Sequence, residues 1–233
     1  TTIAKLMNRL LSPSKGQVLF PERQANSLAA FPVGVVFADP ETQIVGTTVE
    51  EDVAFGLGNL QVPSSEMRIR VDRALERVGL RNSVRRSPHE LSGGEQQKLC
   101  IASILAMEPV CLVLDEPFTF LDRTSRQELL NVLLDLHAEG QTIIALSSDP
   151  EDLVAAQRIL VLRQGMLLTE CSPQTLWKTP GILRQSGIRP PDLLRFRLAL
   201  CQQGYSLRED SLTPEAIADE IGRVETSPKH GAS

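Results

Sequence analysis

The chain has 233 residues, of which 42% are hydrophobic, and its formal net charge is −5. A chain of this length can bury the core of one substantial α/β domain with a small appendage. No apolar stretch approaches the span of a bilayer, which predicts a soluble polypeptide, and the arginines are scattered rather than gathered on one stripe, which disfavours a nucleic-acid surface.

The N-terminal residues have the pattern of an amphipathic helix, because apolar side chains recur at helical spacing at Ile3, Leu6, Met7, Leu10 and Leu11. Thr1 and Thr2 precede this pattern, and by themselves they indicate two N-capping residues. Residues 17–20 predict a short strand, and residues 33–37 predict a core strand.

The middle of the chain alternates between helical and strand patterns. Helices are predicted at residues 64–78, 96–107 and 125–138, and buried strands at residues 110–114 and 141–146. Strands that alternate with helices favour a mostly parallel sheet flanked by helices.

The C-terminal part predicts smaller elements. Residues 158–161 and 166–169 have the pattern of a β-hairpin that turns at Gln164 and Gly165. A short helix is expected to start at Ser172, followed by a hinge-like link over residues 181–191. Two further helices are predicted at residues 193–203 and from about 213 to 224, and a disordered tail at residues 227–233.

A glycine pair at Gly93 and Gly94 follows Ser92 and opens directly into a predicted helix. Glycines have no Cβ to hold a phosphate away, and the N-terminus of a helix presents backbone N–H groups with a partial positive charge. By themselves these residues more often form a capping turn on a surface helix. The pattern is therefore a candidate anion site that needs support from elsewhere in the chain.

That support comes from Asp115 and Glu116, which follow a continuous apolar run. Adjacent carboxylates at the end of a buried parallel strand lie where α/β sheets bind ligands. Such charges are costly near a core unless a cation or a polar substrate meets them. Asp115 suits hydrated Mg²⁺, and Glu116 suits the positioning or deprotonation of an attacking water.

Three motifs in this region resemble those of ATP-binding-cassette (ABC) ATPases. Residues 91–97, LSGGEQQ, resemble the signature motif, residues 112–116 the Walker B strand, and residues 120–122 the D-loop. The sequence of residues 48–56 is similar to that of the energy-coupling-factor branch of the family. Because all three motifs occur in order and at close spacing, the chain is identified as a member of this family, with a P-loop NTPase-like α/β fold.

The resemblance also implies a domain organisation. Residues 1–179 would form the cassette, with a helical subdomain at about residues 50–107, and residues 180–226 would form the C-terminal helical extension that supports pairing of two cassettes. Thr1 would follow directly after the Gly-Lys of a phosphate-binding loop, so we expect that Walker A loop to precede this sequence. By helical spacing alone, residues 180–226 could equally be a small packing subdomain.

In the family, two cassettes associate head to tail, and each ATP lies between them. The resemblance then implies that Ser92, Gly93, Gly94 and Glu95 serve the ATP of the partner cassette. The chain's own site would use Thr1 and Asp115 for Mg²⁺, the latter through water, Thr2 for phosphate and Glu116 as the catalytic carboxylate. Asp122 would lie at the seam between the two sites.

Two positions depart from the family pattern. Ala38 stands where the Q-loop places its glutamine, and Ser148 stands where the switch loop places its histidine. Alanine cannot ligate a metal, and serine reaches less far than an imidazole. Both departures belong to the chain's own site, whereas the signature is intact.

The resemblance implies an ATP-binding and ATP-hydrolysing subunit of an energy-coupling-factor importer for a micronutrient, either a vitamin or a metal ion. Its partners would be a second cassette, identical or paralogous, a transmembrane coupling subunit and a substrate-binding membrane subunit. The chain itself would lie at the cytoplasmic face of the membrane. The alternative is a weak or non-hydrolysing cassette that supplies its signature to a competent paralogue. A soluble ABC protein acting on nucleic acid or ribosomes is disfavoured by the charge and the short helical insertion.

Overall fold

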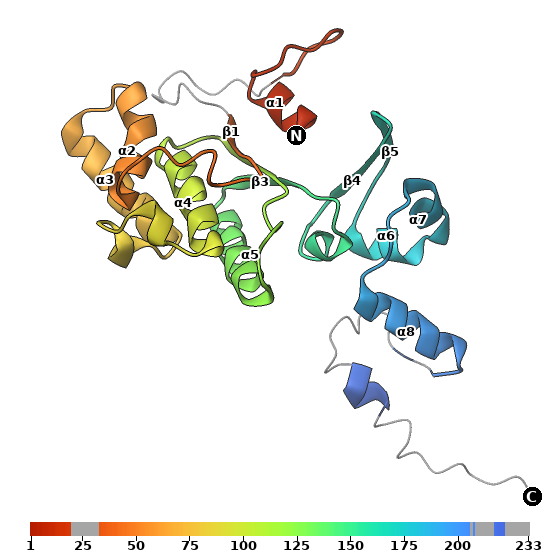
Figure 1. Cartoon of the computed structure of the whole chain (residues 1–233). Helices are drawn as coiled ribbons and strands as arrows, with labels where there is room; N and C mark the ends of the chain where they lie inside the picture. The colour runs from red at the N-terminus through yellow and green to blue at the C-terminus, as the bar shows by residue number, and fades with distance from the viewer. Residues whose placement is uncertain (20–32, 206, 208–216, 222–233) are drawn as a thin grey trace, which may run out of the picture. The chain divides into compact units, whose positions relative to one another are not determined.

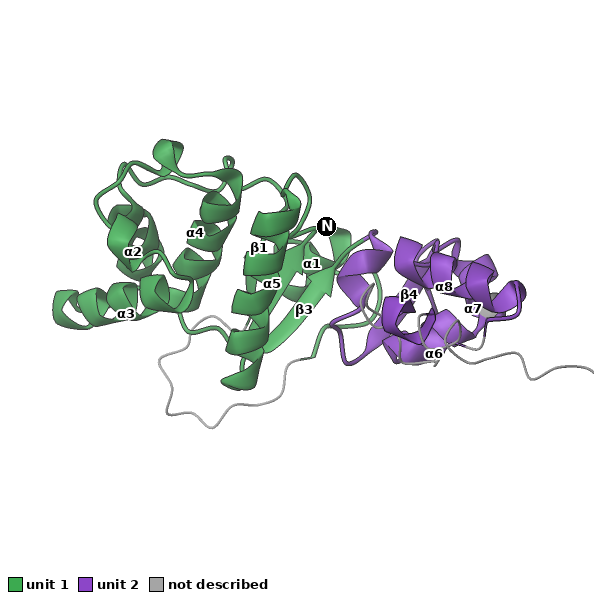
Figure 2. Cartoon of the chain, turned by 90° about the horizontal axis from the view of Figure 1, so that it is seen from below, with its two compact units in different colours: residues 1–147 green, residues 148–233 purple. Residues whose placement is uncertain are grey.

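The computed structural model describes residues 1–19, 33–205, 207 and 217–221. The chain divides into two compact units, residues 1–147 and residues 148–233 (Figure 2). Among the described residues, no helix combines the length and the hydropathy that crossing a bilayer requires.

The first unit is built on a parallel sheet of three strands. These are β1 (Val33–Val36), β2 (Cys111–Asp115) and β3 (Thr142–Leu146), in the order β1-β2-β3. In the centre of the sheet Val35 pairs with Val113, and Val113 pairs with Ile144. Since all three strands run in the same direction, their carboxyl ends meet at one edge.

Helices cover both faces of this sheet, and the alternation of side chains along the strands decides which face each apolar residue joins. Leu112 and Leu114 of β2 pack in the main core, with residues of α4 (Gly93–Ala106) and α5 (Arg123–Ala138). Val113, between them, packs on the other face with Ala4 of α1 (Thr2–Met7). All three β2 residues are fully buried, as expected for a central parallel strand.

The chain between β1 and β2 forms a group of helices that lie side by side in Figure 1. They are α2 (Val49–Asn59), α3 (Ser64–Arg77), the 3-10 turns Arg81–Ser83 and Pro88–Glu90, and α4. Thr48 caps α2 by accepting a hydrogen bond from the backbone N–H of Glu51. Helices α2 and α3 pack on α4, so α4 connects this helical group to the sheet.

The second unit has its own small core. The 3-10 turn Pro150–Leu153 leads into the antiparallel hairpin of β4 (Ile159–Arg163) and β5 (Met166–Cys171). The helices α6 (Pro173–Lys178), α7 (Pro180–Ser186) and α8 (Asp192–Gln202) follow. Ile159, Val161, Leu176, Trp177 and Leu194 are buried together.

Several predicted elements differ from the structure. The N-terminal helix ends at Met7 instead of Leu11, because Arg9 adopts a positive φ of 65° that a right-handed helix does not contain. Residues 17–19 contain no strand, and Phe20 lies outside the described residues. The predicted link at residues 181–191 is helical over its first half, as α7, which ends at the left-handed Gly187.

The burial predicted for residues 141–146 is also wrong. Strand β3 pairs with β2 and has no second partner among the described strands, so its residues are exposed or half-buried. The last predicted helix is described only at residues 217–221, which are helical, and the predicted tail lies outside the described residues.

Candidate functional site

Three adjacent strands of the first unit lead into predicted site residues. Ala38 follows β1 by two residues, Asp115 is the last residue of β2, and Ser148 follows β3 by two residues. Asp115 is paired in register with Leu146. The carboxyl edge of the sheet, where α/β folds bind ligands, is therefore the place to which β1 and β2 bring Ala38 and Asp115.

Asp115 is a buried carboxylate, only 3% exposed. Its Oδ1 accepts a hydrogen bond from the backbone nitrogen of Thr1 at 2.8 Å. Thr2, which is exposed, is the first residue of α1. The fold thus brings Thr1 next to Asp115, although 114 positions separate them in the sequence.

Glu116 follows Asp115 in a strained backbone conformation, with a positive φ of 52°. Non-glycine residues rarely adopt this region, and such strain concentrates at functional sites. Its backbone N–H donates to the carbonyl of Leu146 at 2.8 Å, and its carbonyl accepts from Thr119 N–H. These bonds turn the chain at the end of β2 and leave the side chain of Glu116 half-buried.

The turn at residues 92–95, called here the signature turn, is held by a capping box. The backbone N–H of Glu95 donates to Ser92 Oγ at 3.3 Å, and the backbone N–H of Ser92 donates to Glu95 Oε2 at 2.8 Å. The second bond is the main cause that lowers the pKa of Glu95 below its ordinary value. The N-terminus of α4 is therefore set by the chain's own side chains.

The two glycines of this turn have different surroundings. Gly93 is exposed, and a Cβ added there would meet nothing within 4 Å. Gly94 is buried, and a Cβ there would lie 2.8 Å from Ser125 Cβ, closer than real contacts allow. Gly93 thus leaves open space at the start of α4, whereas Gly94 allows α4 to approach α5.

Asp122 caps the N-terminus of α5. Its Oδ1 accepts a hydrogen bond from the backbone N–H of Ser125 at 2.8 Å, and this bond is the first cause that lowers the pKa of Asp122. Because Ser125 also packs against Gly94, the N-terminal ends of α4 and α5 lie side by side. Phe120, just before Asp122, is 90% exposed and has a φ of 67°.

The loop of residues 37–46 contains Ala38, which is half-buried. The nearby Gln43 does not replace the missing glutamine side chain, because its amide is fully engaged with the loop backbone. Its Oε1 accepts from Phe37 N–H at 2.8 Å, and its Nε2 donates to the carbonyls of Phe37 and Asp39 at 3.0 and 2.8 Å. Ser148, in the second unit, is exposed.

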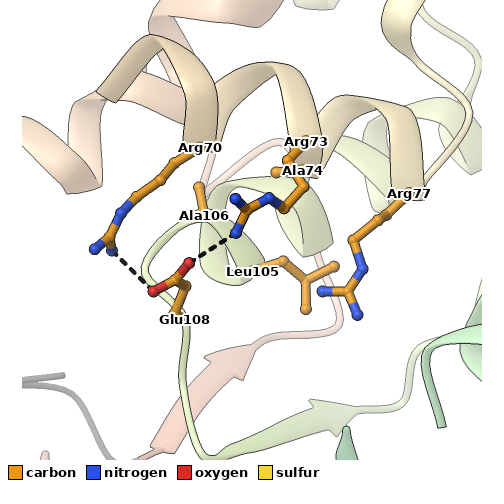
Figure 3. Close-up of a pocket in the computed structure, with 7 residues that line it drawn as sticks. All are labelled: Arg70, Arg73, Ala74, Arg77, Leu105, Ala106 and Glu108. Atoms are coloured by element: carbon orange, nitrogen blue, oxygen red, sulfur yellow. Dashed lines mark hydrogen bonds and ion pairs between the residues drawn. The ribbon is translucent and has the colours of Figure 1, made fainter. Parts of the chain in front are cut away.

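A small hollow lies at the other end of α4, away from the signature turn (Figure 3). It is lined by Arg70, Arg73, Ala74, Arg77, Leu105, Ala106 and Glu108. Glu108 pairs with Arg70 at 3.4 Å and with Arg73 at 3.2 Å, while Arg77 pairs with Glu139. Because the arginines already pair with carboxylates, this hollow serves to anchor α3 and is no second anion site.

The family to which the chain belongs is decided by sequence comparison. A family model described as "ABC transporter" matches residues 1–119, more than half of the chain. The chain belongs to the ABC transporter family. It is the ATPase of a transporter, and its α/β fold is that of an ABC cassette, as its motifs predicted.

The sequence of this ABC ATPase is similar to those of energy-coupling-factor proteins. It is 39% identical to the cobalt import ATP-binding protein CbiO of Syntrophus aciditrophicus, over 98% of this chain and 83% of that protein. It is 40% identical to the energy-coupling factor transporter ATP-binding protein EcfA of Methanosarcina acetivorans, over 96% and 84%. CbiO1 of Clostridium perfringens, solved as part of the ABC transporter complex CbiONQ, superposes with a TM-score of 0.70 at 30% identity, over 84% and 82%.

The roles of two residues, Ser125 beside the signature turn and Asp52 on α2, were not predicted from the sequence. Ser125, which packs against Gly94, carries no sequence signal, because its proximity to α4 depends on the tertiary fold. Asp52 is buried although it lies among the acidic residues of the first turn of α2. Its position did carry a signal, since Asp52 lies at helical spacing with the buried Val49 and Val53.

Proposed function

We propose that this ABC ATPase is the ATP-binding and ATP-hydrolysing subunit of an energy-coupling-factor importer that drives uptake of a vitamin or a metal ion. The observation that carries the proposal is the carboxyl edge of the sheet, where Asp115 and Glu116 end the central strand. The names of the relatives CbiO and EcfA support the importer type.

The chain's own nucleotide site would use the acidic end of β2. Asp115, which lies beside Thr1 in this structure, would hold Mg²⁺ through water together with the hydroxyl of Thr1. Magnesium would neutralise the phosphates of ATP. Thr2 would contact phosphate, and Glu116 would orient or deprotonate the attacking water.

The signature turn would act on the ATP of a second cassette. Gly93 leaves open space for a phosphate at the N-terminus of α4, and Ser92 Oγ can still donate its hydrogen, since the capping bond uses it only as an acceptor. Asp122 would lie at the seam between the two sites, whereas Ser148 would belong to the chain's own site. Neither cassette alone would neutralise a triphosphate, so closure would depend on nucleotide.

The membrane partners would be a transmembrane coupling subunit and a substrate-binding subunit, with this chain peripheral at the cytoplasmic face. The description of CbiO1 as part of a transporter complex supports such an assembly. The test is ATP-dependent substrate uptake by vesicles that contain the full complex. Uptake that stops when ATP is withheld is the expected result, whereas ATP turnover without any co-purifying membrane protein would contradict an importer.

Ala38 and Ser148 favour a second candidate, in which this chain's own site is weak and its signature serves a competent paralogue. The discriminating experiment compares Glu116→Gln with Ser92→Arg in the assembled complex. If the pair is asymmetric, Ser92→Arg should lower the ATP turnover of the complex about tenfold or more. The reason is that an arginine side chain would block the partner's ATP site at the signature turn. Complete loss in Glu116→Gln with no effect of Ser92→Arg would exclude this second candidate.

A further inference from the structure

Asp52 is a carboxylate that the fold buries away from the nucleotide site. The first turn of α2 carries Glu50, Glu51 and Asp52, and the first two are exposed whereas Asp52 is only 4% exposed. An acidic side chain at a helix N-terminus needs no burial to interact with the helix dipole. Burial of a carboxylate is costly unless hydrogen bonds satisfy it, so the contacts of Asp52 explain its position.

The two oxygens of Asp52 bind two different parts of the molecule. Oδ1 accepts hydrogen bonds from the backbone N–H groups of Val45 and Gly46, at 2.8 and 3.0 Å. Oδ2 accepts a hydrogen bond from Ser103 Oγ at 2.8 Å. Val45 and Gly46 end the 37–46 loop, and Ser103 lies on α4, so one carboxylate joins that loop to the helix that begins at the signature turn.

The approach of the loop to α2 is unusually close. A Cβ on Gly46 would lie 2.3 Å from the backbone nitrogen of Asp52, a distance that no side chain tolerates. Glycine at this position therefore allows the loop backbone to reach the carboxylate of Asp52. The contact requires both a glycine at position 46 and a carboxylate at position 52, so it is a specific structural contact and not an incidental surface hydrogen bond.

A second contact joins the same loop to α4. Cys100, one turn before Ser103, places its Sγ 3.7 Å from the carbonyl of Pro40, to which it donates. Burial, together with the nearby charge of Asp52, raises the pKa of the Cys100 thiol to about 12. The thiol thus keeps the proton that this contact requires, and α4 contacts the loop directly at Pro40 and, through Asp52, at Val45 and Gly46.

We propose that Asp52 is a positioning residue that couples the 37–46 loop to α4 through Ser103, so that a displacement of the loop moves the signature turn. The proposal rests on the proposed function, in which a membrane subunit acts on the cassette and the signature turn meets the partner's ATP. Helix α4 has 14 residues and packs on α2, α3 and α5. As a rigid element, it transmits a movement at Ser103 to Ser92.

The test is a Ser103→Ala substitution in the complete transporter complex, with ATP turnover measured with and without transported substrate. This change leaves the bonds from Val45 and Gly46 to Asp52 in place. It removes the link to α4, together with the contact of Ser103 Oγ with the carbonyl of Leu99 within α4 at 3.1 Å. We expect the substrate-stimulated kcat to fall about fivefold, with the KM for ATP unchanged. Ser103→Thr, which retains the hydroxyl, should restore turnover to within about twofold of the wild type.

Two controls make the result decisive. Glu50→Ala removes an exposed acid from the same turn of α2 and should leave the stimulated kcat unchanged. Hydrogen exchange at the Val45 and Gly46 amides should stay slow in Ser103→Ala, because Asp52 still accepts both. Fast exchange there would show that Ser103 supports only the local fold of the loop, and would overturn the coupling role.

The two proposals fail in different ways. A wild-type complex that hydrolyses ATP and transports substrate, with an unaffected Ser103→Ala variant, would overturn the role of Asp52 alone. A raised KM for ATP with unchanged kcat would also overturn it, because that pattern belongs to nucleotide binding. A wild-type complex without ATP turnover would overturn the proposed function and, with it, the coupling that depends on that function.

Discussion

The signature turn and the acidic end of β2 are built in opposite ways. The signature turn is complete within its own helix, because Ser92 and Glu95 satisfy each other's backbone N–H groups. Asp115, in contrast, is buried, and its Oδ1 accepts a hydrogen bond from the backbone nitrogen of Thr1, which is distant in the sequence. One region is held by bonds within a single turn, whereas the other depends on a contact that only the tertiary fold provides.

This difference matches the distribution of departures from the family pattern. Ala38 and Ser148 follow strands that end at the acidic edge, and no departure falls within residues 91–97. A turn stabilised by its own hydrogen bonds retains its shape without ligand. A buried carboxylate changes its stability with whatever cation is present. The comparison therefore predicts that ligand and mutation affect the two regions unequally.

The largest expected effect comes from Asp115→Asn, which removes the negative charge at the acidic edge. We expect a loss of about 10- to 100-fold in magnesium-dependent ATP turnover of the complex, since groups that support a metal through water contribute at this level. Asp135→Asn, an exposed acid on α5, is the matched control and should have no effect. Equal turnover in Asp115→Asn and wild type would remove Asp115 from the magnesium site.

The two glycines of the signature turn should separate stability from activity. Gly94→Ala is expected to destabilise the protein by about 1–3 kcal/mol, because the new Cβ would force Ser125 and α5 to shift. Gly93→Ala meets open space and should leave the midpoint of thermal unfolding nearly unchanged while it lowers ATP turnover of the complex.

A second substitution checks the cause of the Gly94 effect. Ser125→Gly should restore part of the stability of Gly94→Ala, since it removes the atoms that clash. If Gly93→Ala were the more destabilising change, the surroundings described for the two glycines would not explain the fold of this turn.

A gain of function should follow from repair of the Q-loop position. Ala38→Gln is expected to raise ATP turnover by ~2- to 10-fold, because a glutamine amide can contribute one or two hydrogen bonds that Gln43, engaged with the loop backbone, cannot. Turnover of the complex at saturating ATP is the measurement, and Ala138→Gln at an exposed position is the control. No gain would indicate that Ala38 is not the limiting departure.

The smallest effect concerns the pH dependence of the capping box. The pKa of Glu95 is lowered in the folded state, chiefly by the bond from Ser92 N–H. Its contribution is therefore fully present above the unfolded value of about 4.3 and is lost as the pH falls through the lower folded value. Glu95→Ala should lower stability by about 1 kcal/mol at pH 7, and thermal unfolding should show this difference shrinking towards pH 3.

A difference between Glu95→Ala and wild type that stayed constant down to that pH would show that the charge of Glu95 does not stabilise the turn. Glu50→Ala, at an exposed acid near the start of α2, controls for the general loss of a carboxylate.

Local patterns predicted elements of both units. A helix was predicted at residues 125–138 and α5 spans Arg123–Ala138, and a strand was predicted at residues 110–114 and β2 spans Cys111–Asp115. In the second unit, the hairpin of β4 and β5 turns at Gln164 and Gly165, as predicted. These elements follow from caps, apolar runs and turn residues that lie close together in the sequence. The N-terminal helix and residues 17–19 were predicted less well, because short segments without strong tertiary contacts depend on single backbone conformations such as that of Arg9.

Site geometry was predictable in part. The order of strands and the type of sheet placed Asp115 and Glu116 at a carboxyl edge, since parallel strands bring their ends together. The sequence did not indicate that Gly94 is buried against Ser125, or that Gln43 is engaged with the loop backbone. Such contacts join elements whose proximity in space cannot be predicted from the local periodicity of the sequence.

By itself, the sequence determined the family, the ATPase activity and the positions of its motifs, because capping turns and buried strands are specified by neighbouring residues. Only the tertiary structure decided which residues meet across elements: Thr1 with Asp115, Gly94 with Ser125, and Asp52 with both Gly46 and Ser103. The physical reason is that packing of helices on a common sheet brings residues that are distant in the sequence into contact. The local sequence around one of these residues does not identify its partner.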